Sequence, residues 1–337
     1  MKYLRAKMLL LGGLLAISAL GCQPNKPSES QPLRLGWQPP WANQGQIVQV
    51  FKHTDVLARN GVKIEYKPYT FGGPMTEAAL AGELDLLFLG DQPGITLMSR
   101  DSKWYIIARM VNYRSAFLVP PESPVRSLKD LKGKKVAAAF GSTTYRDAVR
   151  ILTDAGLDVG KDVKFANLDQ AEHASFIAGG GIEKWGEVDA IATYDPTIGV
   201  SVQSKQARVL EEWASPSVVL AGESVIRQRP DDIKKFLQAY MEAFALYAKE
   251  PDRFDKLYSV ESRLPLSAEI YRLMAKYEPN LSITDPRLVN VLLSDTQQNN
   301  LQRNADDAFK LGIIKKQVDI RSHVNLSFAD SARKEIK

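Results

Sequence analysis

Cysteine, histidine and long apolar segments are scarce in this sequence. Cys22 is the only cysteine among the 337 residues, which excludes a disulfide framework and a cysteine-based metal site. Three histidines occur, His53, His173 and His323, and all three are expected at the surface. No metal-ligand spacing, catalytic triad or phosphate-loop motif is visible. We therefore expect a protein that has no metal ion, no cofactor and no catalytic residues.

The chain also lacks a strong excess of charge of either sign. It has 44 Lys and Arg residues and 39 Asp and Glu residues, a formal net charge of +5. Three of these cations lie among the first 21 residues, so the rest of the chain carries about +2. Such a weak positive field argues against nucleic acid as a partner. The composition, 45% hydrophobic and 25% charged, is ordinary for a globular protein, and the length allows more than one domain.

The first 21 residues have the layout of an export signal. Three cations and no acid precede or adjoin the apolar block MLLLGGLLAISAL, which is too short for a membrane-spanning helix of about 20 apolar residues. Small residues then precede Cys22, a pattern that resembles a bacterial lipobox. We expect Cys22 to be lipidated, residues 22–32 to form a flexible tether, and the protein to be periplasmic or in the cell envelope, anchored to a membrane. The alternative is that Cys22 is a free thiol in an ordinary leader.

Segments with the patterns of strands and helices alternate after residue 32. Strands are expected at 33–37, 62–66, 85–89, 105–111, 134–140, 163–167 and 190–194. Helices are expected at 46–57, 75–81, 92–99, 128–133 and 231–248, with a further helix that opens at 141–144 and is ended by Gly156. Strands that are separated by helices predict parallel βαβ units.

Two extended crossings, 116–121 and 217–225, divide these units into two α/β domains. Lobe 1 is expected to contain residues 33–116 and 217–337, and lobe 2 residues 117–216. Lobe 1 is thus discontinuous, because its mostly helical C-terminal part follows lobe 2 in the sequence.

One short phrase occurs in both lobes. GELDLLFLGDQP spans residues 82–93 and GEVDAIATYDP spans residues 186–196. In each, an apolar strand is followed by an Asp, Asp91 or Asp195, and then by a Pro within two residues. Ligands of open α/β sheets bind beyond the carboxyl ends of the strands, where these residues lie. Two interpretations remain open for each Asp, namely a helix cap or a ligand contact.

Other polar and aromatic residues also follow predicted strands. The sequence GSTT at 141–144 would present hydroxyls and helix amides to an anion, whereas Asp91 and Asp195 would suit an ammonium or a ring N–H. Two tryptophans in a Pro-rich turn either pack locally or line a pocket. The candidate ligand-binding residues are Trp37, Gln38, Trp41, Asn43, Gly73, Asp91, Gln92, Ser142, Thr143, Thr144, Tyr145, Tyr194 and Asp195.

Four stretches carry a family resemblance: LRLGWQ, YTFGGPMTEAALAGELDLLFLGDQP, FLVPPESPVRSLKDLKGKKVAAAFGSTTYRDAVRILTDAGL and GEVDAIATYDP. Over residues 33–222 the chain resembles the periplasmic solute-binding proteins of ABC importers, in particular the sulfonate, taurine, nitrate and thiamine-precursor group. The resemblance implies the type II periplasmic-binding-protein fold, with two doubly wound α/β domains joined by a hinge of two crossing segments. It further implies a monomer that closes on a small-molecule ligand and delivers it to a membrane permease.

The ligand expected from these residues is a small organic anion or zwitterion, such as a sulfonate or a taurine-like compound. Thr193-Tyr194-Asp195-Pro196 stands where the family often has an aromatic-rich Trp-(Asp/Glu)-Pro phrase, and the segment AGGGIEKW at 178–185 is also unusual. Specificity therefore does not transfer from the resemblance. Two alternatives remain: an enzyme on the same fold that acts on a pyrimidine-precursor-like molecule, and a structural envelope lipoprotein.

Overall fold

The structure is a computed structural model that describes residues 31–178, 185–186, 188–264 and 266–336. Residues Pro32–Lys337 form a single unit. The predicted signal peptide, Cys22 and most of the predicted tether lie outside the described residues, as does most of the segment AGGGIEKW.

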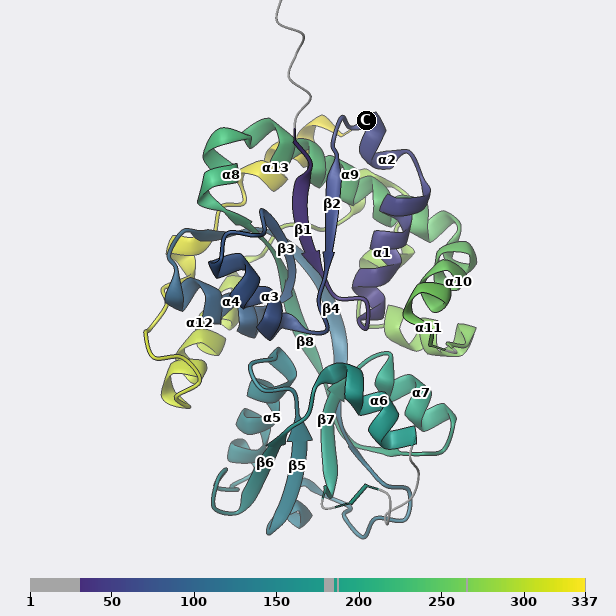
Figure 1. Ribbon diagram of the computed structural model, residues 1–337, viewed down its shortest axis with the longest axis vertical. Helices are drawn as coiled ribbons and strands as arrows, with labels where there is room; N and C mark the ends of the chain where they lie inside the picture. The colour runs from purple at the N-terminus through teal and green to yellow at the C-terminus, as the bar shows by residue number, and fades with distance from the viewer. Residues whose placement is uncertain (1–30, 179–184, 187, 265, 337) are drawn as a thin grey trace, which may run out of the picture. The chain divides into compact units, whose positions relative to one another are not determined.

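The described strands form one eight-stranded sheet in the order β2-β1-β3-β8-β4-β7-β5-β6 (Figure 1). The strands are β1 (Leu33–Trp37), β2 (Ile64–Pro68), β3 (Leu86–Gly90), β4 (Trp104–Val119), β5 (Lys134–Ala138), β6 (Val163–Asn167), β7 (Ala190–Tyr194) and β8 (Arg208–Gly222). Strands β1, β2 and β3 are parallel to one another, and so are β5, β6 and β7. The two groups flank β4 and β8, which are long and antiparallel. This arrangement is an α/β fold with two lobes that share two crossing strands.

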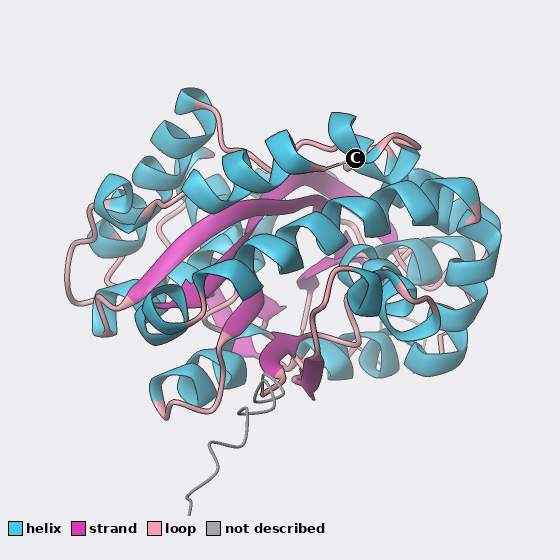
Figure 2. Cartoon of the chain, turned by 90° about the horizontal axis from the view of Figure 1, so that it is seen from above, coloured by secondary structure: helices cyan, strands magenta, loops and turns pink. Residues whose placement is uncertain are grey.

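Helices cover both faces of the sheet (Figure 2). They are α1 (Ala42–His53), α2 (Val56–Arg59), α3 (Gly72–Leu80), α4 (Asp91–Arg100), α5 (Thr143–Asp154), α6 (Gln170–Ala178), α7 (Thr197–Gln203), α8 (Glu223–Gln228), α9 (Pro230–Lys249), α10 (Pro251–Ser262), α11 (Ala268–Ala275), α12 (Asp295–Lys310) and α13 (Ser327–Glu335). Short 3-10 helices occupy Leu128–Leu131, Pro279–Ser282, Pro286–Leu288 and Ile320–His323. In lobe 1, α1 and α9 pack on one face of the sheet, whereas α3, α4 and α12 pack on the other.

Helix α9 shows how the sequence pattern produces this packing. The predicted helix 231–248 is confirmed, and Pro230 begins it, where a missing N–H is not needed. Phe236, Tyr240 and Phe244 recur every four residues and are at most 1% exposed. The rings of Phe236 and Tyr240 pack against Phe51 of α1 and Phe88 of β3, and the Phe244 ring packs against Tyr240. Each fully buried ring stabilises the fold by about 1.5–3 kcal/mol, so this stripe attaches α9 to lobe 1.

The predicted strands 33–37, 163–167 and 190–194 are confirmed with the same bounds. The crossing segments differ from the prediction. The expected strand 105–111 and crossing 116–121 form one continuous strand, β4, because β8 pairs with it through the polar residues between them. Strand β8 begins at Arg208, nine residues before the expected crossing, and helix α7, which follows Asp195 as the repeated phrase predicted, precedes it. The predicted lobe boundaries near residues 116 and 217 stay a prediction.

Two of the three expected surface histidines are buried. His53 is exposed, but His323 is only 8% exposed and His173 is fully buried. The prediction of a surface position was therefore wrong for both. The His173 ring contacts Thr193 Oγ1 at 2.9 Å and the Leu168 carbonyl at 3.1 Å, so two hydrogen bonds offset the burial of this polar ring. Burial lowers the pKa of His173 to about 4.

Candidate functional site

The carboxyl ends of the two groups of parallel strands face each other. Strand β3 is antiparallel to β8 and runs toward lobe 2, where its last residue, Gly90, pairs with Ser217. Strand β7 is antiparallel to β4 and runs toward lobe 1, where its last residue, Tyr194, pairs with Ser115. The segments that follow β3 and β7 therefore meet beside the middle of the crossing strands. This is the region where open α/β sheets bind ligands.

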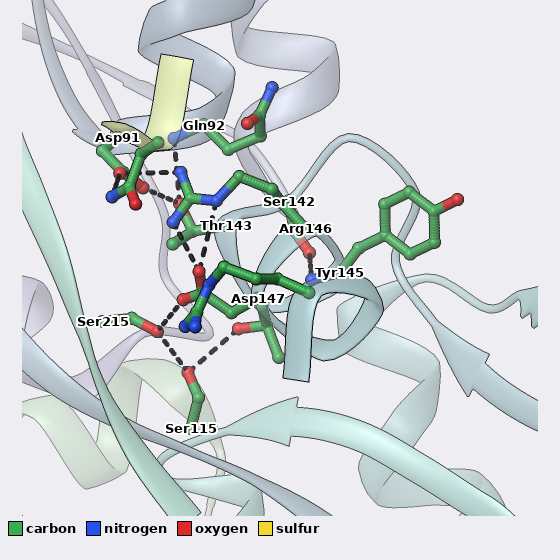
Figure 3. A network of polar contacts seen from close by, with 12 residues as sticks. Asp91, Gln92, Ser115, Ser142, Thr143, Tyr145, Arg146, Asp147 and Ser215 are labelled. Carbon is green, nitrogen blue, oxygen red and sulfur yellow. Dashed lines mark hydrogen bonds and ion pairs between the residues drawn. The ribbon is translucent and has the colours of Figure 1, made fainter. Parts of the chain in front are cut away.

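Asp91, the first residue of α4, is held by three side chains from two other helices, α5 and α12 (Figure 3). Its carboxylate accepts hydrogen bonds from Thr143 Oγ1 at 2.9 Å, Arg146 Nη1 at 2.7 Å and Asn304 Nδ2 at 2.7 Å. Asp91 is only 1% exposed. Gly90, and not Asp91, occupies the N-cap position, and the Gln92 N–H of the first turn donates to Thr143 Oγ1 at 3.1 Å. The helix-cap interpretation is thus wrong for Asp91, which joins α4 and α12 of lobe 1 to α5 of lobe 2.

Arg146 is the centre of a buried polar chain that continues to the crossing strands (Figure 3). It also donates to Asp147 at 2.6 Å, and Ser215 donates to the other oxygen of Asp147 at 3.0 Å. The Ser115 hydroxyl lies 3.0 Å from both the Ser215 and the Thr144 hydroxyls. Burial lowers the pKa of Arg146, but attraction to Asp147 and Asp91 outweighs burial and the net shift of the pKa is upward. The guanidinium therefore stays charged at zero exposure.

Asp195 has a different set of partners. Arg114 of β4 binds both of its oxygens, at 2.8 and 2.9 Å. The backbone N–H of Gly199 in α7 donates to Asp195 at 3.1 Å. Burial raises the pKa of Asp195, while the Arg114 hydrogen bonds oppose that shift. Asp195 thus supports the first turn of its own helix, as a capping residue would, and is neutralised by an arginine of a crossing strand.

Three aromatic rings pack where the strand ends meet. The Trp41 ring centroid lies 4.4 Å from that of Tyr113 and 6.0 Å from that of Tyr194, and the two tyrosine rings are 5.6 Å apart. All three contacts are edge-to-face, and all three residues are less than 5% exposed. We refer to Trp41, Tyr113 and Tyr194 as the aromatic cluster.

Several buried polar atoms in this region have no hydrogen-bond partner among the described residues. They are Trp41 Nε1, Tyr194 Oη, the amide nitrogen and oxygen of Asn43, and Gln92 Oε1. An unsatisfied buried polar atom is destabilising by about 1–3 kcal/mol, so proteins rarely retain several together. These atoms come from the segments after β1 and β3 and from the last residue of β7.

The remaining candidate residues have local partners. Ser142 caps α5 by accepting the Tyr145 N–H at 3.1 Å. The Tyr145 ring points away from the polar network and packs on Phe140 and Phe165 (Figure 3). Gly73 lies against the Phe71 ring.

The residues around Trp37 also form local contacts. Trp37 ends β1, inside the core of lobe 1, and Lys52 lies 4.5 Å from its ring centroid. The Gln38 backbone N–H donates to the Gln44 side chain, and the Gln38 amide donates to the Phe88 carbonyl at 3.4 Å. Trp37 and Gln38 therefore support lobe 1 from within.

Sequence reasoning missed the residues that connect the candidates. They are Tyr113, Arg114, Ser115, Arg146, Asp147, Ser215 and Asn304. The sequence NYRS at 112–115 was a usable signal, because three polar side chains in a strand between apolar runs require buried partners. Among the described residues no group of His, Cys, Asp or Glu side chains forms a metal site, and no helix is sufficiently long and apolar to cross a membrane.

A comparison with known protein families identifies the family of this chain. Residues 53–257 match the family described as "ABC transporter, phosphonate, periplasmic substrate-binding protein". The chain belongs to this family. One relative, the putative aliphatic sulfonates-binding protein of Escherichia coli (strain K12), is 27% identical over 326 residues, which is 94% of this chain and 95% of that protein.

Solved structures share the fold of this substrate-binding protein. The alkanesulfonate-binding protein SsuA from Xanthomonas axonopodis pv. citri, bound to MOPS, superposes with a TM-score of 0.72 at 21% identity, over 88% of this chain and 99% of SsuA. The desulfurization enzyme DSZB superposes with a TM-score of 0.65 at 15% identity, over 91% of this chain and 100% of the enzyme. The fold is therefore shared by binding proteins and an enzyme.

Proposed function

We propose that this protein captures a small organic sulfonate between its two lobes and delivers it to a membrane permease. The observation that carries the proposal is the set of unpartnered polar atoms of Trp41, Asn43 and Tyr194 at the facing strand ends. The family, and the relatives whose names refer to aliphatic sulfonates and alkanesulfonate, support the same class of ligand.

The first turn of α5 supplies the anion-binding end of the proposed site. Backbone amides at a helix start have no partner within the helix, and the helix dipole favours negative charge there. Ser142, Thr143 and Thr144 occupy this turn, and each hydroxyl already has a protein partner. The backbone amides are therefore the proposed sulfonate contacts, with the hydroxyls holding the turn in place.

The aromatic cluster supplies the other end of the proposed site. Its rings offer an apolar wall to the organic part of the ligand, while Trp41 Nε1, Tyr194 Oη and the Asn43 amide offer hydrogen bonds. A small inorganic anion has no apolar part to contact these rings, and these polar atoms would stay without a partner. The carboxylates of Asp91 and Asp195 are neutralised by Arg146 and Arg114, so we favour a simple sulfonate over a zwitterion with an ammonium group.

The proposed mechanism is binding and release with a shift in the population of closed lobes. The ligand favours the closed form because only that form contacts it from both sides. Contacts between segments of the two predicted lobes support such a closed arrangement. Thr70 donates to Asp169 at 3.2 Å, and Gln203 of α7 donates to Ser267 at 2.9 Å. No covalent change of the ligand is part of the proposal.

Calorimetry with propanesulfonate, taurine and inorganic sulfate tests the ligand class. We expect propanesulfonate to bind most tightly, to raise the melting temperature and to compact the protein in X-ray scattering. Recovery of the unchanged sulfonate after incubation is expected as well. Binding of inorganic sulfate as tight as that of propanesulfonate, or a scattering profile unaltered at saturation, would contradict the proposal. A chemically converted product would favour the enzyme interpretation instead.

A matched pair of variants tests the site. Tyr194→Phe removes a buried hydroxyl from the aromatic cluster, and Tyr240→Phe removes a buried, equally unpartnered hydroxyl from the α9 core. One lost hydrogen bond of about 1 kcal/mol weakens sulfonate binding roughly fivefold in the first variant. The second variant should bind as the unaltered protein does. Equal affinities for all three proteins would remove Tyr194 from the site.

We also propose that Cys22 carries the lipid anchor. The apolar leader and the small residues before Cys22 support this proposal. Mass spectrometry of the protein purified from membranes should find an acylated N-terminal Cys22, and Cys22→Ser should release the protein from the membrane fraction. An unmodified Cys22 in membrane-bound protein would exclude the anchor and leave the ligand proposal unaffected.

A further inference from the structure

A cavity of about 390 Å³ lies beside the crossing strands, and its lining differs from the residues of the proposed sulfonate site. Its lining residues come from β4, β8, α5, α12 and the segment before α12, and none of the thirteen candidate residues is among them. Asn112 lines the cavity, whereas the next residue, Tyr113, belongs to the aromatic cluster. Neighbouring residues of a strand point to opposite sides, so Asn112 and Tyr113 lie on opposite sides of β4.

Four arginines line this cavity, and two of them are fully engaged by acids. Arg109 forms a buried pair with Glu278, and Arg146 is shared by Asp91 and Asp147. These pairs leave little attraction for a further anion, because each guanidinium already faces carboxylates at hydrogen-bond distance.

The other two arginines are weakly engaged and come from different helices. Arg150 of α5 has an ion pair with Asp154 at 3.3 Å, in which both side chains are more than a third exposed, and such pairs contribute at most about 1 kcal/mol. Arg303 of α12 donates to the amide oxygen of Asn300. Asp307 of α12 also lines the cavity and opposes a second negative charge. The charges therefore suit a monoanion better than a dianion.

Apolar and amide side chains complete the lining. Val218, Leu293 and Leu301 offer an apolar surface, and Gln297 offers amide donors and acceptors. A volume of about 390 Å³ falls within the range of small-molecule sites, roughly 300–1,000 Å³. The chemistry fits a molecule with one anionic group and a short apolar body.

The cavity is connected to the strand ends through two of its own lining residues. Arg146 and Asn304 both line the cavity, and both donate to the Asp91 carboxylate at 2.7 Å. Asp91 in turn accepts from Thr143, in the first turn of α5. An occupant of the cavity thus contacts the residues that position the start of α5, and α5 and α12 lie on the same side of β8 in Figure 1.

We propose that this cavity is a second ligand site, which binds a small organic carboxylate between Arg150 and Arg303 and thereby favours closure of the lobes. The carboxylate joins α5 of lobe 2 to α12 of lobe 1, so it binds more tightly when these helices approach. Binding at the two sites is then coupled, and the coupling factor is the same in both directions.

A heavy-atom probe locates the second site directly. We expect crystals soaked with 4-bromobenzoate to show the bromine anomalous peak in the cavity, with the carboxylate between Arg150 and Arg303. Calorimetry of the full chain with 4-bromobenzoate should show about tenfold weaker binding, or ~1.4 kcal/mol, for Arg150→Gln and for Arg303→Gln. Arg227→Gln is the control, since Arg227 is exposed on α8 and pairs with Glu223. A peak confined to the region of the aromatic cluster, or equal binding by all four proteins, would overturn the proposal.

A second titration measures the coupling. Saturating 4-bromobenzoate should strengthen propanesulfonate binding at least threefold, and saturating propanesulfonate should strengthen 4-bromobenzoate binding by the same factor. Both enhancements should disappear in the double variant Arg150→Gln/Arg303→Gln, whose binding of propanesulfonate alone stays normal. Unchanged affinities in the presence of the other ligand would refute the coupling. If the unaltered protein does not bind propanesulfonate at all, that result would instead contradict the proposed function.

Discussion

The two copies of the repeated phrase place an Asp at the same position, but the two Asp side chains have different surroundings. Asp91 accepts hydrogen bonds from Thr143 and Arg146 of the other lobe. Asp195 is bound by Arg114 of a crossing strand and by an amide of its own helix. The first copy therefore binds side chains of α5 and α12, whereas the second binds a crossing strand and its own helix. Similar sequence at similar positions in two α/β units does not imply the same role.

The largest expected effect comes from removing the arginine that Asp91 shares with Asp147. Arg146→Met leaves both buried carboxylates without their cation, and breaking a buried ion pair in this way destabilises a protein by about 3–5 kcal/mol. Urea unfolding measures the loss. Arg227→Met, which alters an exposed pair on α8, should change stability by less than about 0.5 kcal/mol. A loss below 1 kcal/mol for Arg146→Met would show that the first copy does not depend on this connection.

The second copy should respond to pH through His173, which contacts Thr193 just before Tyr194 and Asp195. Burial lowers the pKa of His173 from 6.5 to about 4, so the folded protein resists its protonation. The stability contribution is complete above pH 6.5 and is lost as the pH falls toward 4, a change on the order of 3 kcal/mol. Unfolding free energies of His173→Gln should vary less with pH over this range than those of the unaltered protein. His53→Gln is the exposed control, and an identical pH dependence for all three proteins would contradict the burial of His173.

The smallest expected effect on stability tests the contact between the lobes. Thr143→Val keeps the shape of the side chain but removes the hydrogen bond to Asp91 at 2.9 Å and the acceptor of the Gln92 N–H at 3.1 Å. We expect a loss of about 1–2 kcal/mol in unfolding free energy, since two buried groups lose a partner. Thr153→Val, at an exposed position of the same helix, should alter stability by less than about 0.5 kcal/mol. Equal stability of the two variants would mean that Thr143 does not tie the lobes together.

Much of the fold followed from pattern alone. The apolar run after Asp85 predicted a strand buried on both sides, and all five residues of β3 are buried. The stripe at 233, 236, 240 and 244 predicted α9 and the side it buries. These predictions succeeded because burial of apolar surface has a period that the sequence displays directly.

Partners of polar groups were less predictable than burial. Asp91 was recognised as a residue at a strand end, but Arg146 and Asn304 lie 55 and 213 positions away. His173 was expected at the surface because its neighbours are polar, yet Thr193 and Leu168 satisfy both ring nitrogens inside lobe 2. No periodicity in the sequence predicts such pairs, because they depend on how separate elements pack.

The amino-acid sequence alone thus predicted the alternation of strands and helices, the buried strands, and the polar residues that follow these strands. Tertiary packing decided which carboxylate meets which arginine, which hydroxyls remain unpaired and where the cavity between α5 and α12 lies. The physical reason is range: helix and strand preferences act over a few residues along the chain, whereas a buried charge requires a partner within about 3 Å in space, however far away that partner is in sequence.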